Sequence, residues 1–165
     1  EELLVWIDEE IGLPVDRALS THFHGDRTGG VAVLEAAGIP VWSHPMTQRL
    51  SAEEGNPVPP NALNGIDAPG SATRFGTVEV FYPGGGHARD NIMVWLPEQK
   101  MLYGGCAVRE LATDNLGNTA DADLAHWPRA IRNAQARYPG AETVIPGHGE
   151  PGGPELLEHM HALFE

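Results

Sequence analysis

Cysteine and positive charge are both scarce in this sequence. The chain has 165 residues and a single Cys, so no disulfide can form within it. Ten Lys and Arg residues stand against 23 Asp and Glu residues, which gives a formal net charge of −13 at pH 7. A nucleic-acid groove needs basic stripes, so this balance argues against a nucleic-acid partner. It also argues, though less strongly, against binding to an anionic membrane surface.

A long apolar run and an initiating Met are absent as well. The given chain contains neither a transmembrane stretch nor a signal peptide. It starts at Glu1 and enters a helical pattern directly, which indicates a fragment or a processed form of a longer protein. Glycine, by contrast, is plentiful at 20 residues. Many of these glycines stand beside the candidate ligands described below, where the backbone must turn sharply or approach another group.

The chain is organised around a short motif that contains His22, His24 and Asp26 at alternate positions. In an extended backbone, residues two positions apart point to the same side, so these three side chains can converge. Imidazole nitrogens and a carboxylate oxygen are ligands that zinc accepts. The competing interpretation of this motif alone is a polar turn with incidental histidines.

Three later glycine-rich loops each add one further donor after an expected strand. These donors are His87, Cys106 and His148, and Cys106 is the only Cys of the chain. Six donors are too many for one tetrahedral zinc ion, but they suit two metal ions with three protein ligands each. Three ligands leave a position open for water, which is typical of a catalytic metal site.

The order of expected elements predicts an α/β fold with the candidate site at one edge of the sheets. Long connections are expected over residues 55–70, as a surface segment, and over 107–125, as a functional or mobile loop. Helices are expected over residues 2–11, 29–37, 45–54, 127–137 and 154–164, and strands over 15–20, 39–42, 72–75, 77–82, 91–96, 101–103 and 142–145.

These motifs together resemble the metallo-β-lactamase superfamily, and the metal-ligand pattern resembles class B, subclass 1, the two-zinc enzymes. The resemblance covers nearly the whole chain and is strongest to the VIM-type (Verona) lineage. It rests on the six donors and on the stretches around them, at residues 21–30, 75–84, 102–107, 120–124 and 144–149.

The resemblance implies a cofactor of two Zn²⁺ ions. The first would be bound by His22, His24 and His87, and the second by Asp26, Cys106 and His148. Cys106 stands where glyoxalase-type hydrolases and lactonases of the superfamily carry a bridging Asp. Arg27 stands where those relatives usually carry a metal-binding His. Both positions favour the β-lactamase branch over the other hydrolases.

The resemblance also implies an architecture and a cellular location. The family fold is a four-layer αβ/βα sandwich, and residues 1–165 would be a single domain corresponding to its C-terminal two-thirds to three-quarters. The N-terminal strands would be missing from this chain, which leaves an exposed apolar sheet edge. By resemblance we expect the complete protein to be a periplasmic monomer that has no nucleic-acid or membrane partner.

The activity that the resemblance implies is hydrolysis of the β-lactam amide bond by a zinc-bound hydroxide, in penicillins, cephalosporins and carbapenems, which confers antibiotic resistance. Asp26 would orient the hydroxide, and Asn118 would donate a hydrogen bond to the developing oxyanion. Arg109 would bind the substrate carboxylate, since Arg109 and Thr113 stand at the two loop positions where relatives carry that contact. The alternatives are another hydrolase of the same fold, acting on a thioester, lactone or phosphoester, or an inactive zinc-binding fragment.

The other histidines are expected to be structural. His44 and His126 stand at expected helix starts. His159 and His161 are two positions apart on the last helix and therefore do not face each other. Trp127 is expected to pack in the core, and Asn91 is a candidate support for the neighbouring ligand loop.

Overall fold

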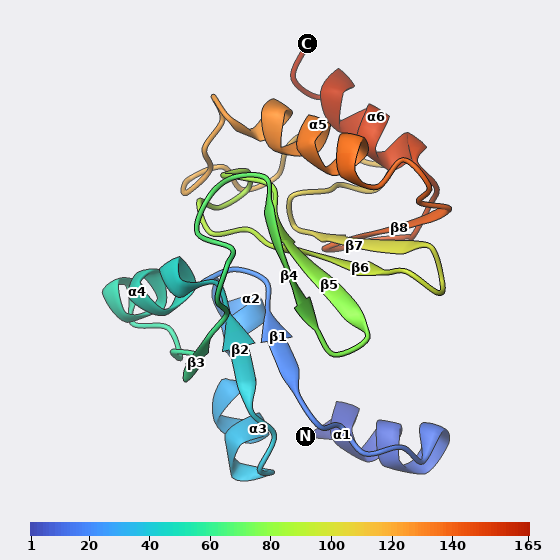
Figure 1. Cartoon of the computed structure of the whole chain (residues 1–165). Coiled ribbons are helices and arrows are strands. Elements are labelled where there is room, and N and C mark those ends of the chain that lie inside the picture. The colour runs from blue at the N-terminus through green and yellow to red at the C-terminus, as the bar shows by residue number, and fades with distance from the viewer. The chain divides into compact units, whose positions relative to one another are not determined.

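The computed structural model describes residues 1–165, which divide into two compact units, Glu1–Leu63 and Asn64–Glu165. Helices alternate with strands in the N-terminal unit, and in the C-terminal unit helices flank a sheet (Figure 1). The predicted α/β class is therefore confirmed.

The N-terminal unit begins with the predicted helix over residues 2–11. It forms as α1 (Glu2–Trp6) and continues as one turn of π-helix, η1 (Ile7–Ile11). Gly12 ends it with φ 67°, a left-handed conformation that glycine adopts without steric cost. None of the residues of α1 and η1 is buried.

A parallel three-stranded sheet follows, in the order β1 (Ala18–Ser20), β2 (Val41–Ser43), β3 (Asn61–Ala62). Parallel neighbours need crossover connections. Here α2 (Gly25–Thr28) and α3 (Val31–Ala36) join β1 to β2, and α4 (Pro45–Glu54) precedes β3.

Two predictions in this unit were incomplete. The helix expected over residues 29–37 forms as α3 (Val31–Ala36), but the short helix α2 that precedes it was not predicted. The segment 55–70 is not wholly a surface connection, because β3 lies within it. The predicted start of α4 is confirmed: the backbone N–H of Met46 donates to His44 Nδ1 at 3.0 Å, and Pro45 occupies the first turn.

The C-terminal unit contains a five-stranded sheet in sequence order. Its strands are β4 (Ser71–Phe75), β5 (Val78–Tyr82), β6 (Met93–Leu96), β7 (Met101–Gly105) and β8 (Thr143–Pro146). The first three pairs are antiparallel, and β7 and β8 are parallel. It follows that β5, β7 and β8 run in the same direction, so their C-terminal ends share one sheet edge.

Two helices pack on this sheet. Figure 1 shows α5 (Trp127–Arg137) and α6 (Glu155–Ala162) side by side over one face. Their apolar sides form a continuous core with the strands, which includes Phe81, Met93, Leu102, Trp127, Ile131, Leu156 and Met160. Burying side chains of this size stabilises the fold by about 1.5–3 kcal/mol each.

Glu79 on β5 ties the sheet to the C-terminal end of α5. Its carboxylate accepts hydrogen bonds from Arg137 Nε and Nη2, both at 2.9 Å, and from the Tyr138 hydroxyl at 2.7 Å. The Arg137 hydrogen bond is the main cause that lowers the pKa of Glu79, while partial burial works against it. Burial, followed by the Glu79 carboxylate, raises the pKa of Tyr138, which keeps its hydroxyl a neutral donor.

The lowered pKa of Glu79 predicts a pH-dependent stability. A carboxyl whose pKa is lower in the folded state stabilises that state above the unfolded pKa, ordinarily 4.5, and this contribution is lost as pH falls through the folded pKa. We expect Glu79→Gln to cost about 1 kcal/mol or less at pH 7, and the cost to shrink in acid. Urea denaturation at both pH values measures this. Glu98→Gln, at an exposed turn residue, is the control. An equal loss of stability in Glu98→Gln would contradict the role assigned to Glu79.

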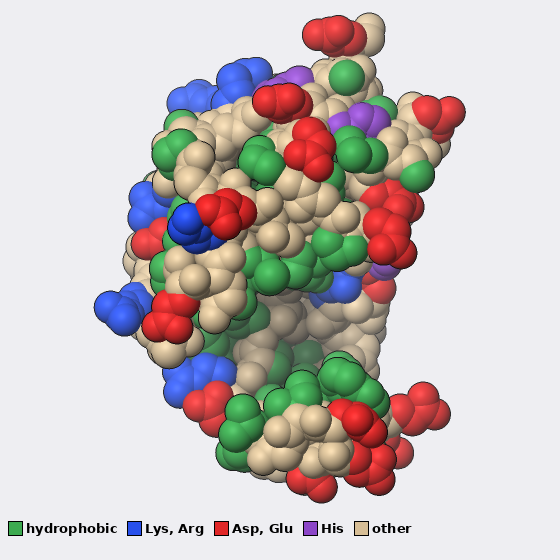
Figure 2. Space-filling view, turned by 90° about the vertical axis from the view of Figure 1, so that its right-hand side faces the viewer, with side chains coloured by type: hydrophobic (Ala, Val, Ile, Leu, Met, Phe, Trp, Pro, Cys, Tyr) green, Lys and Arg blue, Asp and Glu red, His purple; other side chains and the backbone are tan.

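The surface is strongly acidic. Asp and Glu side chains are spread over the face shown in Figure 2, as the net charge of −13 implies. No helix in the structure combines the length and the apolar character that crossing a membrane requires.

Candidate metal centre

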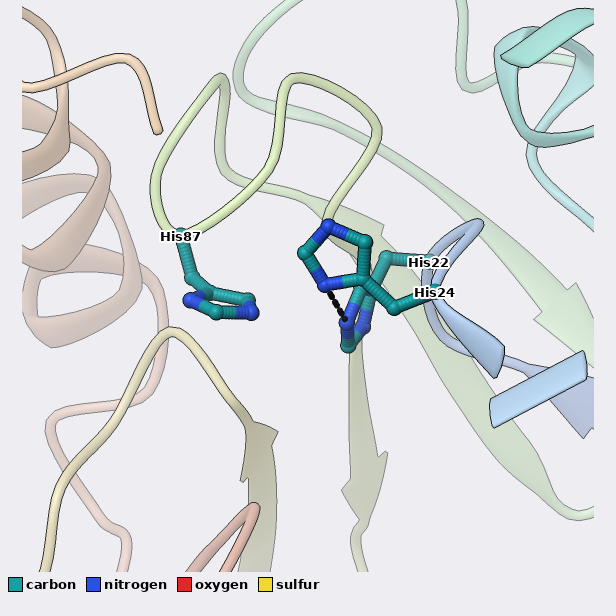
Figure 3. A group of neighbouring side chains, drawn as sticks. All are labelled: His22, His24 and His87. Atoms are coloured by element: carbon teal, nitrogen blue, oxygen red, sulfur yellow. Dashed lines mark hydrogen bonds between the residues drawn. The ribbon is translucent and has the colours of Figure 1, made fainter. Parts of the chain in front are cut away.

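The three donors of the N-terminal motif lie close together as predicted, although Asp26 is in the helix α2 and not in the extended backbone that the alternation argument assumed. His22 Nε2 and His24 Nδ1 are 3.1 Å apart, and His22 Nε2 lies 3.9 Å from Asp26 Oδ1. Figure 3 shows the two imidazoles of this loop, with the hydrogen bond between their rings as a dashed line. His22 is fully buried, so its ring cannot depend on solvent for its orientation.

Hydrogen bonds to the backbone hold this loop in place. Thr28 Oγ1 donates to the His24 carbonyl at 3.1 Å, and Asn56 Nδ2 donates to the Phe23 carbonyl at 3.0 Å. Asp26 lies in the first turn of α2, where a carboxylate is favoured by the helix dipole. Arg27 Nε lies 3.5 Å from Asp26 Oδ2 and adds a positive charge beside that carboxylate.

In the C-terminal unit, His87, Cys106 and His148 all follow strands that end at the same sheet edge, because β5, β7 and β8 run in one direction. The sequence predicted this placement at one edge from the position of each donor after a strand. Figure 3 shows His87 on the loop that follows β5.

The His87 loop is supported from within. The backbone N–H of Ala88 donates to Asn91 Oδ1 at 2.6 Å, and the Tyr82 hydroxyl donates to the Arg89 carbonyl at 2.8 Å. Burial, with the nearby Asp90 and Asp123 carboxylates, raises the pKa of Tyr82. Its hydroxyl therefore stays protonated and able to donate across this loop. Asn91 has the supporting contact that its sequence position suggested.

The loops that carry Cys106 and His148 pack closely against each other. A methyl group on Gly147 would lie 2.5 Å from the Cys106 backbone nitrogen and 2.6 Å from its sulfur, so no larger residue fits there without movement. Cys106 is buried, with 6% of its surface exposed. The close approach brings the backbone that carries His148 alongside the Cys106 thiol.

Trp127 contacts both the His87 loop and the Cys106 loop. Its indole Nε1 donates to the Ala107 carbonyl at 2.9 Å, and its ring packs on Gly86, where an added methyl group would lie 3.2 Å from Cδ1. The centroid of its ring is 6.0 Å from that of His87. The sequence predicted a packing role for Trp127, and its fully buried position confirms this. Its link between two ligand loops was missed.

Arg109 and Asn118, the two candidate substrate contacts, lie on one long loop. Gly117 packs beside the Arg109 guanidinium, since an added methyl group would lie 3.1 Å from Nη1. The Nε of Arg109 is buried without a hydrogen-bond partner. The carbonyl oxygen of the exposed Asn118 side chain accepts from the Ala120 N–H at 3.0 Å, so the side chain offers its amide NH₂ group as the donor.

The histidines expected to be structural each have a protein partner. His126 Nδ1 pairs with Asp123 Oδ1 at 2.9 Å. His159 Nε2 donates to the Thr113 carbonyl at 2.8 Å, and His161 Nε2 pairs with Gln135 Oε1 at 2.9 Å. These contacts agree with the predicted roles.

The donor chemistry fits zinc. One unit offers two imidazoles and a carboxylate, and the other offers two imidazoles and the only thiol. Nitrogen and sulfur donors of this kind suit a borderline-soft cation better than they suit Ca²⁺ or Mg²⁺, which prefer oxygen ligands.

Comparison with known proteins gives one consistent result. A family model described as the metallo-beta-lactamase superfamily matches residues 3–148. A protein named metallo-beta-lactamase type 2 from Bacteroides fragilis is 37% identical over 163 residues, which cover 99% of this chain and 65% of that relative. The chain thus spans slightly less than two thirds of the length of this relative.

Solved structures match as well. A metallo-beta-lactamase from Hirschia baltica superposes with a TM-score of 0.95 at 36% identity, over 99% of this chain and 74% of that one. The metallo-beta-lactamase FIM-1 from Pseudomonas aeruginosa, described in a mono-zinc form, superposes with a TM-score of 0.92 at 37% identity, over 99% of this chain and 72% of that one.

Proposed function

This chain belongs to the metallo-β-lactamase superfamily and has its fold, and on that premise we propose that the protein is a zinc-dependent hydrolase of the β-lactam amide bond. Penicillins, cephalosporins and carbapenems are the proposed substrates. The observation that carries the proposal is the convergence of His22, His24 and Asp26 on one loop. The single Cys in a second ligand loop supports the β-lactamase branch of the family.

We assign the ligands by the family pattern to two zinc ions. By that pattern His22, His24 and His87 would hold the first ion, and Asp26, Cys106 and His148 would hold the second. We assign His148 to the second ion because its loop packs on Cys106.

The chemistry of the reaction divides between metal and protein. A bound zinc ion lowers the pKa of a coordinated water to about 7 and polarises a carbonyl group. Asp26 accepts a hydrogen bond from the attacking water and orients it, as well as binding metal. The Asn118 amide donates to the oxygen on which negative charge develops as the lactam carbonyl is attacked. Cys106 acts as a ligand and not as a nucleophile.

Arg109 is proposed to bind the substrate carboxylate with two parallel hydrogen bonds. Its buried Nε without a partner and its guanidinium beside Gly117 support this role. Losing a charge-assisted contact of this kind costs about 1.5–3 kcal/mol, so we expect Arg109→Ala to lower kcat/KM about 10–100-fold, mainly through KM. Arg109→Lys keeps the charge and should lose less. Unchanged steady-state kinetics in Arg109→Ala would contradict the role.

The finer family assignments are also proposals. The VIM-type lineage is suggested by the stretches around the ligands, and a periplasmic address and a resistance phenotype follow from it. We propose that both units belong to one domain, which predicts a single cooperative unfolding transition. Expression of the full-length protein in a susceptible host tests the phenotype and the address. An unchanged minimal inhibitory concentration, despite soluble periplasmic protein, would contradict the resistance proposal.

Hydrolysis of a chromogenic cephalosporin and a carbapenem by the full-length protein tests the main proposal. We expect turnover of both, loss of turnover with a chelator, and recovery when zinc is added back. Bound zinc without lactam turnover would refute the activity and leave the metal site. A folded protein without stoichiometric zinc would refute the metal site as well.

A further inference from the structure

Glu110 belongs to none of the sequence motifs and has no part in the proposed mechanism. It follows Arg109 on the loop after β7 and is partly buried. Its carboxylate Oε2 accepts a hydrogen bond from the backbone N–H of Glu150 at 2.9 Å. Glu150 lies two residues after His148, so this bond crosses from the loop that carries Cys106 to the loop that carries His148.

Gly149 shows how closely the two loops fit. It has φ +90°, and a methyl group added there would overlap the Glu110 carboxylate. The backbone conformation disfavours any residue other than glycine here, and a side chain would also displace the Glu110 carboxylate. The carboxylate fills the space against the backbone next to His148.

His148 is thus held from both sides by one segment of the chain. On one side, Gly147 packs on Cys106, and its backbone N–H donates to the Val108 carbonyl at 3.4 Å. On the other side, Glu110 binds the Glu150 N–H. A ligand residue between two such anchors has little freedom to move away from the Cys106 thiol.

We propose that Glu110 is a positioning residue that sets the place of His148 relative to Cys106, and so the metal affinity of the Asp26–Cys106–His148 site. This inference rests on the proposed function. Glu110 does not touch metal or substrate; it acts through the backbone of the His148 loop. Because Glu110 directly follows Arg109, it also connects the His148 loop to the residue proposed to bind the substrate carboxylate.

Metal titration of the full-length protein tests the proposal. In the Co²⁺ form, the thiolate-to-cobalt charge-transfer absorption reports the site that contains Cys106, separately from the three-histidine site. We expect Glu110→Ala to weaken metal binding at the Cys106 site about 10–100-fold, the usual range for supporting groups around metal ligands. Binding at the three-histidine site should not change. Glu110→Gln keeps an acceptor oxygen and should restore most of the affinity.

Glu155, the first residue of α6, supplies a matched control. Its Oε1 accepts the backbone N–H of Gly153 at 2.7 Å, so it makes the same kind of contact farther from His148. Glu155→Ala should leave the Cys106 site unchanged. If Glu110→Ala does not fold, Glu110→Asp keeps the charge, shortens the side chain by one methylene group and should still weaken binding.

The outcomes separate the two proposals. If the folded Glu110→Ala and Glu110→Asp proteins bind metal at the Cys106 site as tightly as the wild type, the role of Glu110 is overturned and the metal site stays intact. An equal loss in Glu155→Ala would also overturn it, because the effect would then be a general loosening of the loop. A wild-type protein without thiolate-to-cobalt absorption would overturn the proposed metal site, and this inference with it.

Discussion

Replacing Cys106 with Ser is expected to reduce the metal content from two zinc ions per chain to one. We also expect kcat/KM to fall at least about 100-fold, which is more than the loss usual for supporting groups around a metal site. A thiolate is a strong anionic zinc ligand, whereas the Ser hydroxyl is neutral at pH 7. Ser has nearly the shape of Cys, so it also fits the close contact with Gly147. Metal analysis after dialysis and steady-state kinetics measure the two effects.

His161→Asn is the matched control for this change. His161, on α6, belongs to the same unit and pairs with Gln135 on α5, and neither residue is part of a ligand loop. This variant should keep both zinc ions and its activity. A Cys106→Ser protein that retained two zinc ions and full turnover would show that Cys106 is only a buried core residue.

The candidate ligands could be predicted from sequence because each depends on local chain geometry. His22, His24 and Asp26 stand close together in the sequence, so a compact loop that leads into α2 keeps their side chains near one another. His87, Cys106 and His148 each follow a strand, and the parallel directions of β5, β7 and β8 bring those strand ends to one edge. Neither inference required knowledge of contacts between distant residues.

Two of the supporting residues, Glu110 and Trp127, could not be assigned their roles in this way. Glu110 meets Glu150 and Trp127 meets Ala107 through contacts that join residues 40 and 20 positions apart. No local pattern distinguishes Glu110 from an acidic surface residue of a loop. A short element such as β3, which has two residues, is missed for a related reason, since alternation cannot be detected over so few positions.

Trp127→Ala is expected to destabilise the protein by about 3–5 kcal/mol, the usual cost of removing a large buried aromatic side chain. Trp127 is fully buried and contacts Phe164 as well as the two ligand loops. Trp127→Phe keeps most of the ring but leaves the Ala107 carbonyl without its indole donor, which should cost about 1–3 kcal/mol. Urea denaturation followed by circular dichroism gives both values.

Trp95 distinguishes positioning from packing. It is half-buried and stacks on Tyr138 with a centroid distance of 5.0 Å, on a strand that carries no ligand. Trp95→Phe should therefore lower stability without changing metal affinity. Trp127→Phe should lower both, because the Ala107 carbonyl follows Cys106 directly and Gly86 precedes His87. If both variants kept wild-type metal affinity, Trp127 would be a core residue only, and the two ligand loops would be held by their own hydrogen bonds.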